Sequence, residues 1–165
     1  MTPEGVFIQL MLRHTWLVFI AVTCVNGAVW WRRGRAHILT NPALQDGYKR
    51  LVRGWLIFGN LPWVVMGAGI VFGGIPSVFY YLNPRNGPVV LTWYLTVVAL
   101  WVISVHWLFF RQGAEALVAH PGLLNLPSSR PGLVKAYFLL CLAGGIAGLL
   151  AMIVLDLPVN FPVAN

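Results

Sequence analysis

Residues Val89–Phe110 read "VVLTWYLTVVALWVISVHWLFF" and contain no Lys, Arg, Asp or Glu. A helix needs about 20 predominantly apolar residues to cross the hydrocarbon core of a bilayer, so this stretch is long enough to span one. Backbone N–H and C=O groups inside lipid must pair within their own segment, which favours a helix. The stretch therefore predicts a transmembrane helix.

Three further runs share this apolar character and contain no Lys or Arg. They are Thr15–Trp31, Trp55–Gly74 and Ala136–Leu157; the first can be extended back to Phe7 only by including Arg13. The whole chain is 59% hydrophobic and 9% charged, whereas a soluble domain is about 25% charged. We therefore expect an all-α polytopic membrane protein, a single domain over residues 1–165 with four transmembrane helices at about 15–31, 55–74, 89–110 and 136–157.

The basic residues predict the orientation of these helices. Between the first and second runs lie Arg32, Arg33, Arg35, Lys49, Arg50 and Arg53; between the third and fourth lie Arg111, Arg130 and Lys135; on the other side lie Arg13 and Arg85. Cytoplasmic loops carry the excess of Lys and Arg, so both termini are expected outside the cytoplasm, in a bacterial inner membrane. The first helix is expected to be retained, not cleaved as a signal peptide.

The net charge of +7 also raises the possibility of nucleic-acid binding. The placement of the charges argues against it, because "RRGR" at Arg32–Arg35 directly follows an apolar run and two tryptophans, as at a membrane edge. The six basic residues of the first connection are therefore interpreted as contacts to anionic lipid headgroups. The expected partners are the bilayer, other membrane subunits or a second copy of the chain, and not nucleic acid.

The connections also carry structural signals. Asn41-Pro42 is a helix-start pattern, and residues 42–54 place apolar and basic side chains on opposite sides. This predicts an amphipathic helix on the cytoplasmic leaflet, before the chain turns into the second span. The aromatic stretch at residues 75–88 is expected at the outer interface, and Trp63 and Trp101 between helices.

The two cytoplasmic connections resemble each other. "RRGRAHILTNPAL" from Arg32 and "RQGAEALVAHPGL" from Arg111 match in arginine, glycine and proline at an offset of 79 residues. One interpretation is a duplication of helical hairpins, since parallel repeats occur in membrane proteins. The other is that any helix leaving a membrane favours arginine, glycine and a later proline.

Three polar residues are the candidate cofactor-binding site. Asn26, Asn60 and His106 each lie about four to six residues from the cytoplasmic end of their helices, so a rise of 1.5 Å per residue places them at one depth. Polar groups at that depth usually face the bundle interior. The functional interpretation is a pocket with His106 as ligand or proton carrier, beside a bend at Pro62. The alternative is interhelical hydrogen bonding that only holds the bundle together.

Two pairs of glycines are candidate packing or docking positions. Gly69 and Gly73 lie one turn apart in the second run, and Gly144 and Gly148 in the fourth. Small residues spaced in this way let helix backbones approach closely. They predict either docking on a partner subunit or packing of the second span on the fourth.

The sequence contains no phosphate-binding loop, zinc-protease helix or serine elbow. Cys24 and Cys141 are too far apart for a metal motif, so both are expected to be small buried hydrophobes. No catalytic or metal site is predicted, and no cofactor is identified. The leading hypothesis is a non-enzymatic accessory or scaffold subunit of a membrane. The alternatives are a redox subunit holding haem, quinone or pigment near His106, and a small oligomeric transporter or lipid-binding protein.

Overall fold

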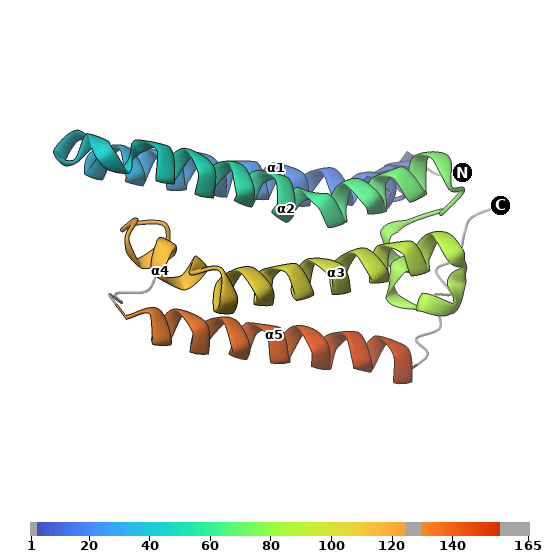
Figure 1. Ribbon diagram of the computed structural model, residues 1–165. Coiled ribbons are helices and arrows are strands. Elements are labelled where there is room, and N and C mark those ends of the chain that lie inside the picture. Colours follow the sequence, from blue (N-terminus) through green and yellow to red (C-terminus); the bar gives the residue numbers. More distant parts are fainter. Residues whose placement is uncertain (1–2, 125–129, 156–165) are drawn as a thin grey trace.

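The computed structural model describes residues 3–124 and 130–155, and this part of the chain is helical without a strand (Figure 1). The elements in order are α1 (Pro3–Thr40), η1 (Pro42–Leu44), α2 (Gln45–Phe72), η2 (Val78–Leu82), η3 (Pro84–Asn86), α3 (Pro88–Phe110), α4 (Gly113–Val118) and α5 (Pro131–Val154). The last two residues of the fourth expected span, 156–157, lie outside the described residues.

Four helical segments are long and apolar enough to cross a membrane. They are Met11–Thr40, Pro42–Phe72, Pro88–Phe110 and Pro131–Val154, with mean hydropathies of 1.3, 1.7, 2.0 and 2.3. The expected all-α class with four such helices is confirmed. Proline begins α3 and α5, as its fixed φ and missing N–H favour at the first helical position.

The first connection differs from the expectation. α1 continues through "RRGR" to Thr40, and α2 runs without interruption from Gln45 to Phe72. A separate helix turning into the second span was therefore a wrong prediction. The only break is at Asn41-Pro42, where the Asn41 side chain accepts a hydrogen bond of 3.3 Å from the backbone N–H of Ala43. No other breaker interrupts either helix at this hairpin, so both extend well beyond their apolar cores.

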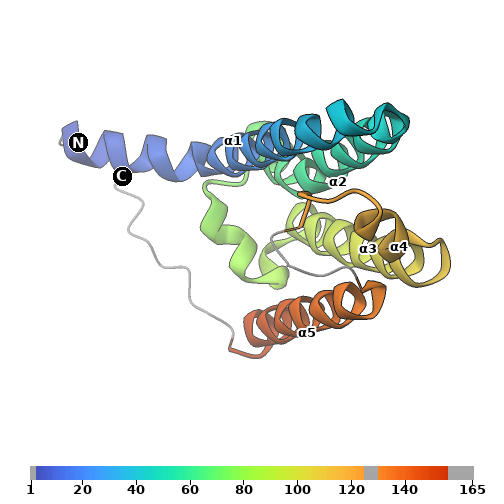
Figure 2. The same cartoon turned by 90° about the vertical axis from the view of Figure 1, so that its left-hand side faces the viewer.

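The helices form layers (Figures 1 and 2). α1 and α2 make an antiparallel hairpin, α3 with α4 lies beneath it, and α5 lies on the far side of α3. We call the two ends of this stack the α4 end, which holds residues 36–50 and 110–124, and the η2 end, which holds residues 70–90. α5 packs on α3 and α4, and its remaining surface faces away from the other described helices.

Small residues of α1 and α2 let these helices approach closely. An added Cβ at Gly27 would lie 2.7 Å from Leu56, and one at Gly67 would lie 2.5 Å from the ring of Trp16. Trp63 stacks on Phe19 with ring centroids 4.2 Å apart, so its expected position between helices is confirmed. Glycines allow this proximity because a Cβ would overlap atoms of the facing helix.

The aromatic stretch at the η2 end contributes to the core, and its expected place at the outer membrane interface remains a prediction. Tyr81 is 2% exposed, and its hydroxyl donates a 3.1 Å hydrogen bond to the carbonyl of Met66 on α2. The carbonyl of Tyr81 accepts a 2.8 Å bond from the hydroxyl of Tyr94 on α3. This tyrosine therefore joins the first hairpin to α3, a role that its position in an aromatic loop did not reveal.

The two hairpins do not pack alike, although their connections resemble each other in sequence. α1 and α2 contact each other along most of their length, whereas α3 and α5 meet at few positions, among them Trp101 and Gly145. Trp101 thus packs between helices, as expected. Gln112, with φ of 53°, separates α3 from α4, while the corresponding part of α1 stays helical. The duplication of hairpins remains a prediction.

Candidate functional site

Of the three polar residues of the candidate cofactor-binding site, only Asn60 is turned toward another helix. Asn60 on α2 faces α1: its side-chain N–H donates to the carbonyl of Leu56 at 2.8 Å and lies 3.8 Å from the sulfur of Cys24. Its Oδ1 atom is buried without a hydrogen-bond partner among the described residues. Asn26 on α1 is exposed. Only one of the two asparagines therefore lies within the helix hairpin.

His106 on α3 is exposed and does not join Asn60. Its ring stacks on Phe110 one turn further along, with centroids 5.7 Å apart and planes at 25°. Asn26, Asn60 and His106 therefore do not converge on one pocket within this chain. His106 as a cofactor ligand remains a prediction that nothing in this geometry specifically favours.

The expected burial of the two cysteines was wrong. Cys24 and Cys141 are both free thiols, and both are exposed instead of buried. Each lies on a helix that contacts neighbours along one side only, so an apolar sequence context did not imply burial. Among the residues that the structure describes, no three His, Cys, Asp or Glu side chains are grouped so as to hold a metal ion.

The two glycine pairs have different surroundings. A Cβ at Gly69 of α2 would overlap the hydroxyl of Tyr81, and one at Gly73, the C-cap of α2, would lie 2.9 Å from Val89 of α3. On α5, a Cβ at Gly144 or Gly148 would meet no atom of the described residues within 4 Å. Packing of the second span on the fourth is therefore wrong as an explanation: the α2 pair packs on η2 and α3, and the α5 pair faces outward.

The outward face of α5 is built from small residues. Ala143, Ala147 and Ala151 lie beside Gly144 and Gly148, and all five are exposed. We call these five residues the α5 small-residue face. The space beside the adjacent Gly145 is filled, since a Cβ at Gly145 would lie 2.9 Å from the ring of Trp101. α5 thus packs on α3 with one side, while its small-residue face has no neighbour in the part of the chain that the structure describes.

A packed cluster at the α4 end was not anticipated from sequence. Tyr48 of α2 is 0% exposed, its hydroxyl donates a 2.7 Å hydrogen bond to the carbonyl of Pro121, and its ring meets that of His120 edge-on at 4.9 Å. The Nδ1 atom of His120 lies 2.6 Å from the carbonyl of Ala116. A carbonyl only accepts hydrogen bonds, so Nδ1 carries the proton.

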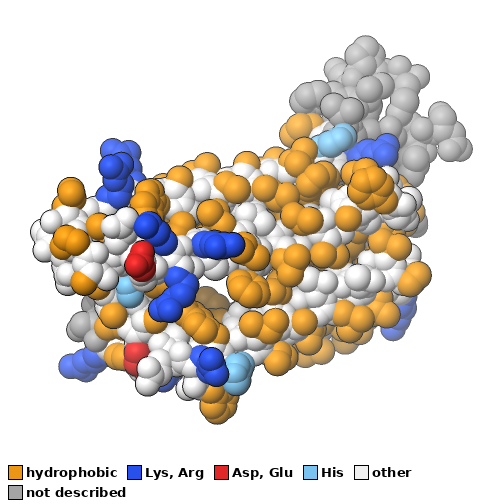
Figure 3. Space-filling model, turned by 45° about the horizontal axis from the view of Figure 1, so that its top comes forward, with side chains coloured by type: hydrophobic (Ala, Val, Ile, Leu, Met, Phe, Trp, Pro, Cys, Tyr) orange, Lys and Arg blue, Asp and Glu red, His pale blue; other side chains and the backbone are white. Residues whose placement is uncertain are grey.

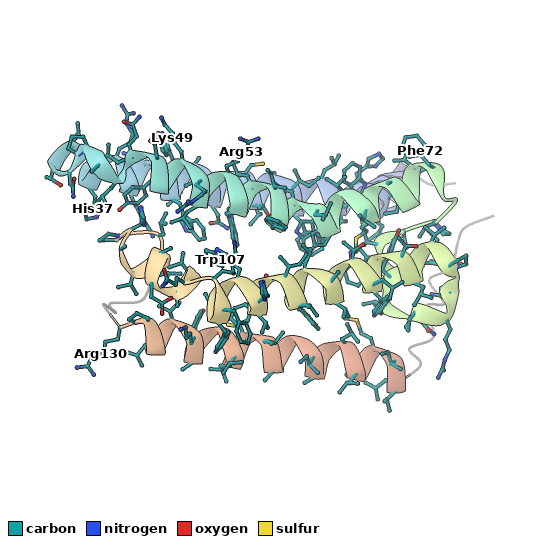
Figure 4. The ribbon with its side chains drawn as sticks, in the orientation of Figure 1. His37, Lys49, Arg53, Phe72, Trp107 and Arg130 are labelled. Carbon is teal, nitrogen blue, oxygen red and sulfur yellow. The ribbon has the colours of Figure 1, made fainter. Side chains whose placement is uncertain are left out.

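Glycines make room for this cluster. A Cβ at Gly47 would overlap Nε2 of His120, and one at Gly34 would lie 2.7 Å from the ring of Tyr48. Figure 4 shows His37 pointing from α1 toward the segment around α4, where a Cβ at Gly122 would lie 3.6 Å from its Nε2 atom. Glycines inside helices were the available signal, because such a glycine often marks a close approach.

One ion pair ties α4 to α5. The Lys135 amino group lies 3.1 Å from a carboxylate oxygen of Glu115. The pKa of Glu115 is lowered, first by a hydrogen bond from its own backbone N–H and then by one from Lys135. The carboxylate is therefore held in its charged form, and the last helix is joined to the preceding segment by a charge-assisted hydrogen bond.

The six basic residues of the first connection are all exposed and lie near the α4 end. They are Arg32, Arg33 and Arg35 on α1, and Lys49, Arg50 and Arg53 on α2. Figure 3 shows Lys and Arg side chains gathered over one end of the molecule and hydrophobic side chains over most of the remaining face. This division places positive charge next to a largely apolar surface.

Comparison with known proteins found no matching family model, no matching characterised protein and no matching solved structure.

Proposed function

We propose that the chain is an integral membrane subunit that docks on another membrane helix through the α5 small-residue face, and that it has a scaffold or accessory role instead of a catalytic one. The other helix belongs to a partner subunit or to a second copy of the chain. The membrane is a bacterial inner membrane, with the α4 end on the cytoplasmic side and both termini outside. The four long apolar helices and the basic α4 end support this assignment.

The open glycines of α5 carry the docking proposal. A glycine in a helix interior costs about 0.5–1 kcal/mol relative to alanine, and no atom of the described residues packs close to Gly144 or Gly148 in compensation. Apolar side chains gain little by leaving lipid, so helices in membranes associate through close packing of small residues. A second helix against this face would make use of both glycines.

The test compares two glycines that both lie in open space on α5. Gly148 belongs to the α5 small-residue face, whereas Gly132 lies 16 residues earlier, about 24 Å away along the helix axis, beyond the end of that face. At either position the Cβ of a leucine has no atom of residues 3–124 or 130–155 within 4 Å, so both variants should fold. We expect Gly148→Leu to weaken association about tenfold, the equivalent of 1–2 kcal/mol of helix packing, and Gly132→Leu to leave it unchanged.

Association is measured by gentle solubilisation from the native membrane followed by mass determination of the complex. A lone wild-type monomer with no co-purifying protein would contradict the docking proposal. Equal association of both variants would contradict the choice of face. Release of the chain from membranes by alkaline carbonate would contradict its membrane integration.

A further inference from the structure

We infer that the outer side of α2 holds a binding site for one phospholipid with an anionic phosphate headgroup. The site is an open notch of about 410 Å³ at the α4 end, lined by Asp46, Lys49, Arg50, Arg53, Gly54 and Ile57. We call these residues the α2 notch. The inference rests on the proposed membrane location, but not on the docking role of α5.

The notch carries uncompensated positive charge. Its three cations face one carboxylate, Asp46, whose oxygen lies 3.6 Å from the Lys49 amino group with both side chains more than half exposed. Exposed pairs of this kind contribute little, so Lys49 is available to another anion. Arg50 and Arg53 have no carboxylate partner in the described part of the chain. An anion with more than one acceptor oxygen would meet this charge.

The basic side chains of the notch lie on one side of α2, where a single phosphate headgroup could contact more than one of them. Lys49 and Arg53 are four residues apart, and Figure 4 shows both pointing away from the bundle on the same side of α2. A Cβ at Gly54 would meet no atom within 4 Å, so space is left beside Arg50 and Arg53. Guanidinium groups bind phosphate oxygens in pairs of parallel hydrogen bonds.

The occupant is assigned as a lipid, and not a free phosphate, because apolar surface adjoins the cations. One turn beyond Arg53, Ile57 is 53% exposed, followed by Phe58 at 49% and Leu61 at 39%. A phosphate held by the cations would leave acyl chains running along these side chains. Basic residues beside the apolar part of a membrane helix recognise anionic headgroups in this way.

The experiment titrates purified full-length protein in detergent with phosphatidylglycerol, and counts the retained lipid by native mass spectrometry. Parallel titrations use phosphatidylcholine, whose headgroup has no net charge, and inorganic phosphate. Each cation contributes roughly a fivefold gain in affinity for an anionic lipid surface, so Arg50→Gln with Arg53→Gln should lower retention about 25-fold. The matched control is Arg111→Gln with Arg130→Gln, which removes two exposed arginines that lie outside the notch and outside the first connection.

A second variant distinguishes lipid binding in the α2 notch from lipid binding to general surface charge. Gly54→Leu keeps every charge but fills the open space beside the arginines. We expect it to lower phosphatidylglycerol retention about fivefold, the equivalent of one lost cation contact. Gly132→Leu, at another open glycine, should have no effect.

Three results would overturn the inference. They are equal retention by Gly54→Leu and wild type, an equal loss in the Arg111→Gln with Arg130→Gln control, and displacement of the lipid by an equal concentration of inorganic phosphate. The last result would assign the site to a free anion. Because Gly54 lies on α2, the association of α5 measured with Gly148→Leu is independent of each of these outcomes.

Discussion

Gly47 and His120 lie 73 residues apart in the chain and share one space at the α4 end. The imidazole is 9% exposed and is fixed by its hydrogen bond to Ala116, so it cannot easily move away from α2. Gly47 leaves room for it because it has no side chain. The absence of a side chain at Gly47 thus allows the segment after α3 to pack closely on the first hairpin.

Gly47→Ala is expected to destabilise this contact by about 1–3 kcal/mol, the usual cost of adding a methylene to a packed site. Hydrogen exchange of residues 113–124 should accelerate, and the midpoint of thermal unfolding in detergent should fall. Gly54→Ala is the matched control, because its Cβ enters open space on the same helix. It should raise stability by about 0.5–1 kcal/mol, the helix preference of alanine over glycine. Identical behaviour of the two variants would refute the contact.

At the scale of elements, α5 depends on α4 as well as on α3. Lys135 at the start of α5 reaches Glu115 of α4, and Val134 is buried against Leu108 and Ala114. Beyond Trp101 and Gly145, much of α5 is exposed. The helix is therefore held more firmly at its first turns than along its small-residue face, which leaves that face available.

The Glu115–Lys135 pair predicts a dependence on pH. The folded pKa of Glu115 lies below its ordinary value of 4.5, so the pair contributes stability above pH 4.5 and this contribution is lost as pH falls through the folded pKa. The midpoint of thermal unfolding of wild type should exceed that of Glu115→Gln at about pH 6, and the difference should vanish near pH 3. Asp46→Asn, which removes an exposed carboxylate of α2, is the control and should produce a smaller difference. A difference that persists in acid would show that the charge of Glu115 is not the cause.

At the scale of the whole molecule, the arrangement is a stack of layers and not a closed bundle. α1 is 38 residues long, which corresponds to about 57 Å at 1.5 Å per residue. A bilayer core is about 30 Å thick, so the proposed span leaves much of α1 outside. The basic part of α1, together with α4 and the start of α2, then forms a compact projection on one side of the membrane.

The orientation can be tested with reporters. After Asn165, a reporter that functions only outside the cytoplasm should be active. Near Gln45, a reporter that functions only in the cytoplasm should be active. The physical reason is the excess of Lys and Arg in the connections at the α4 end. The reverse pattern would overturn the orientation, and activity of both reporters on one side would overturn the number of spans.

Much of the architecture could be predicted from sequence, because it depends on contiguous residues. Apolar runs of about 20 residues with no Lys or Arg predict helices that are long enough to span a bilayer. Proline at the start of α3 and α5, and Asn41-Pro42 between α1 and α2, predict where helices begin and end. Prolines and caps act within a few residues of themselves, so these boundaries do not require knowledge of the fold.

The tertiary structure decided which helix faces meet. The helices α3 and α5 carry apolar side chains on nearly all of their own sides, so no polar stripe in their sequences identifies the side that packs. The side chain of Asn60 contacts Cys24, whereas His106 is exposed. The Tyr81 hydroxyl packs against Gly69, whereas no side chain of the described residues packs against Gly148. These choices depend on the fit of large rings against glycines that are distant in the chain, and that fit exists only once the helices are placed side by side.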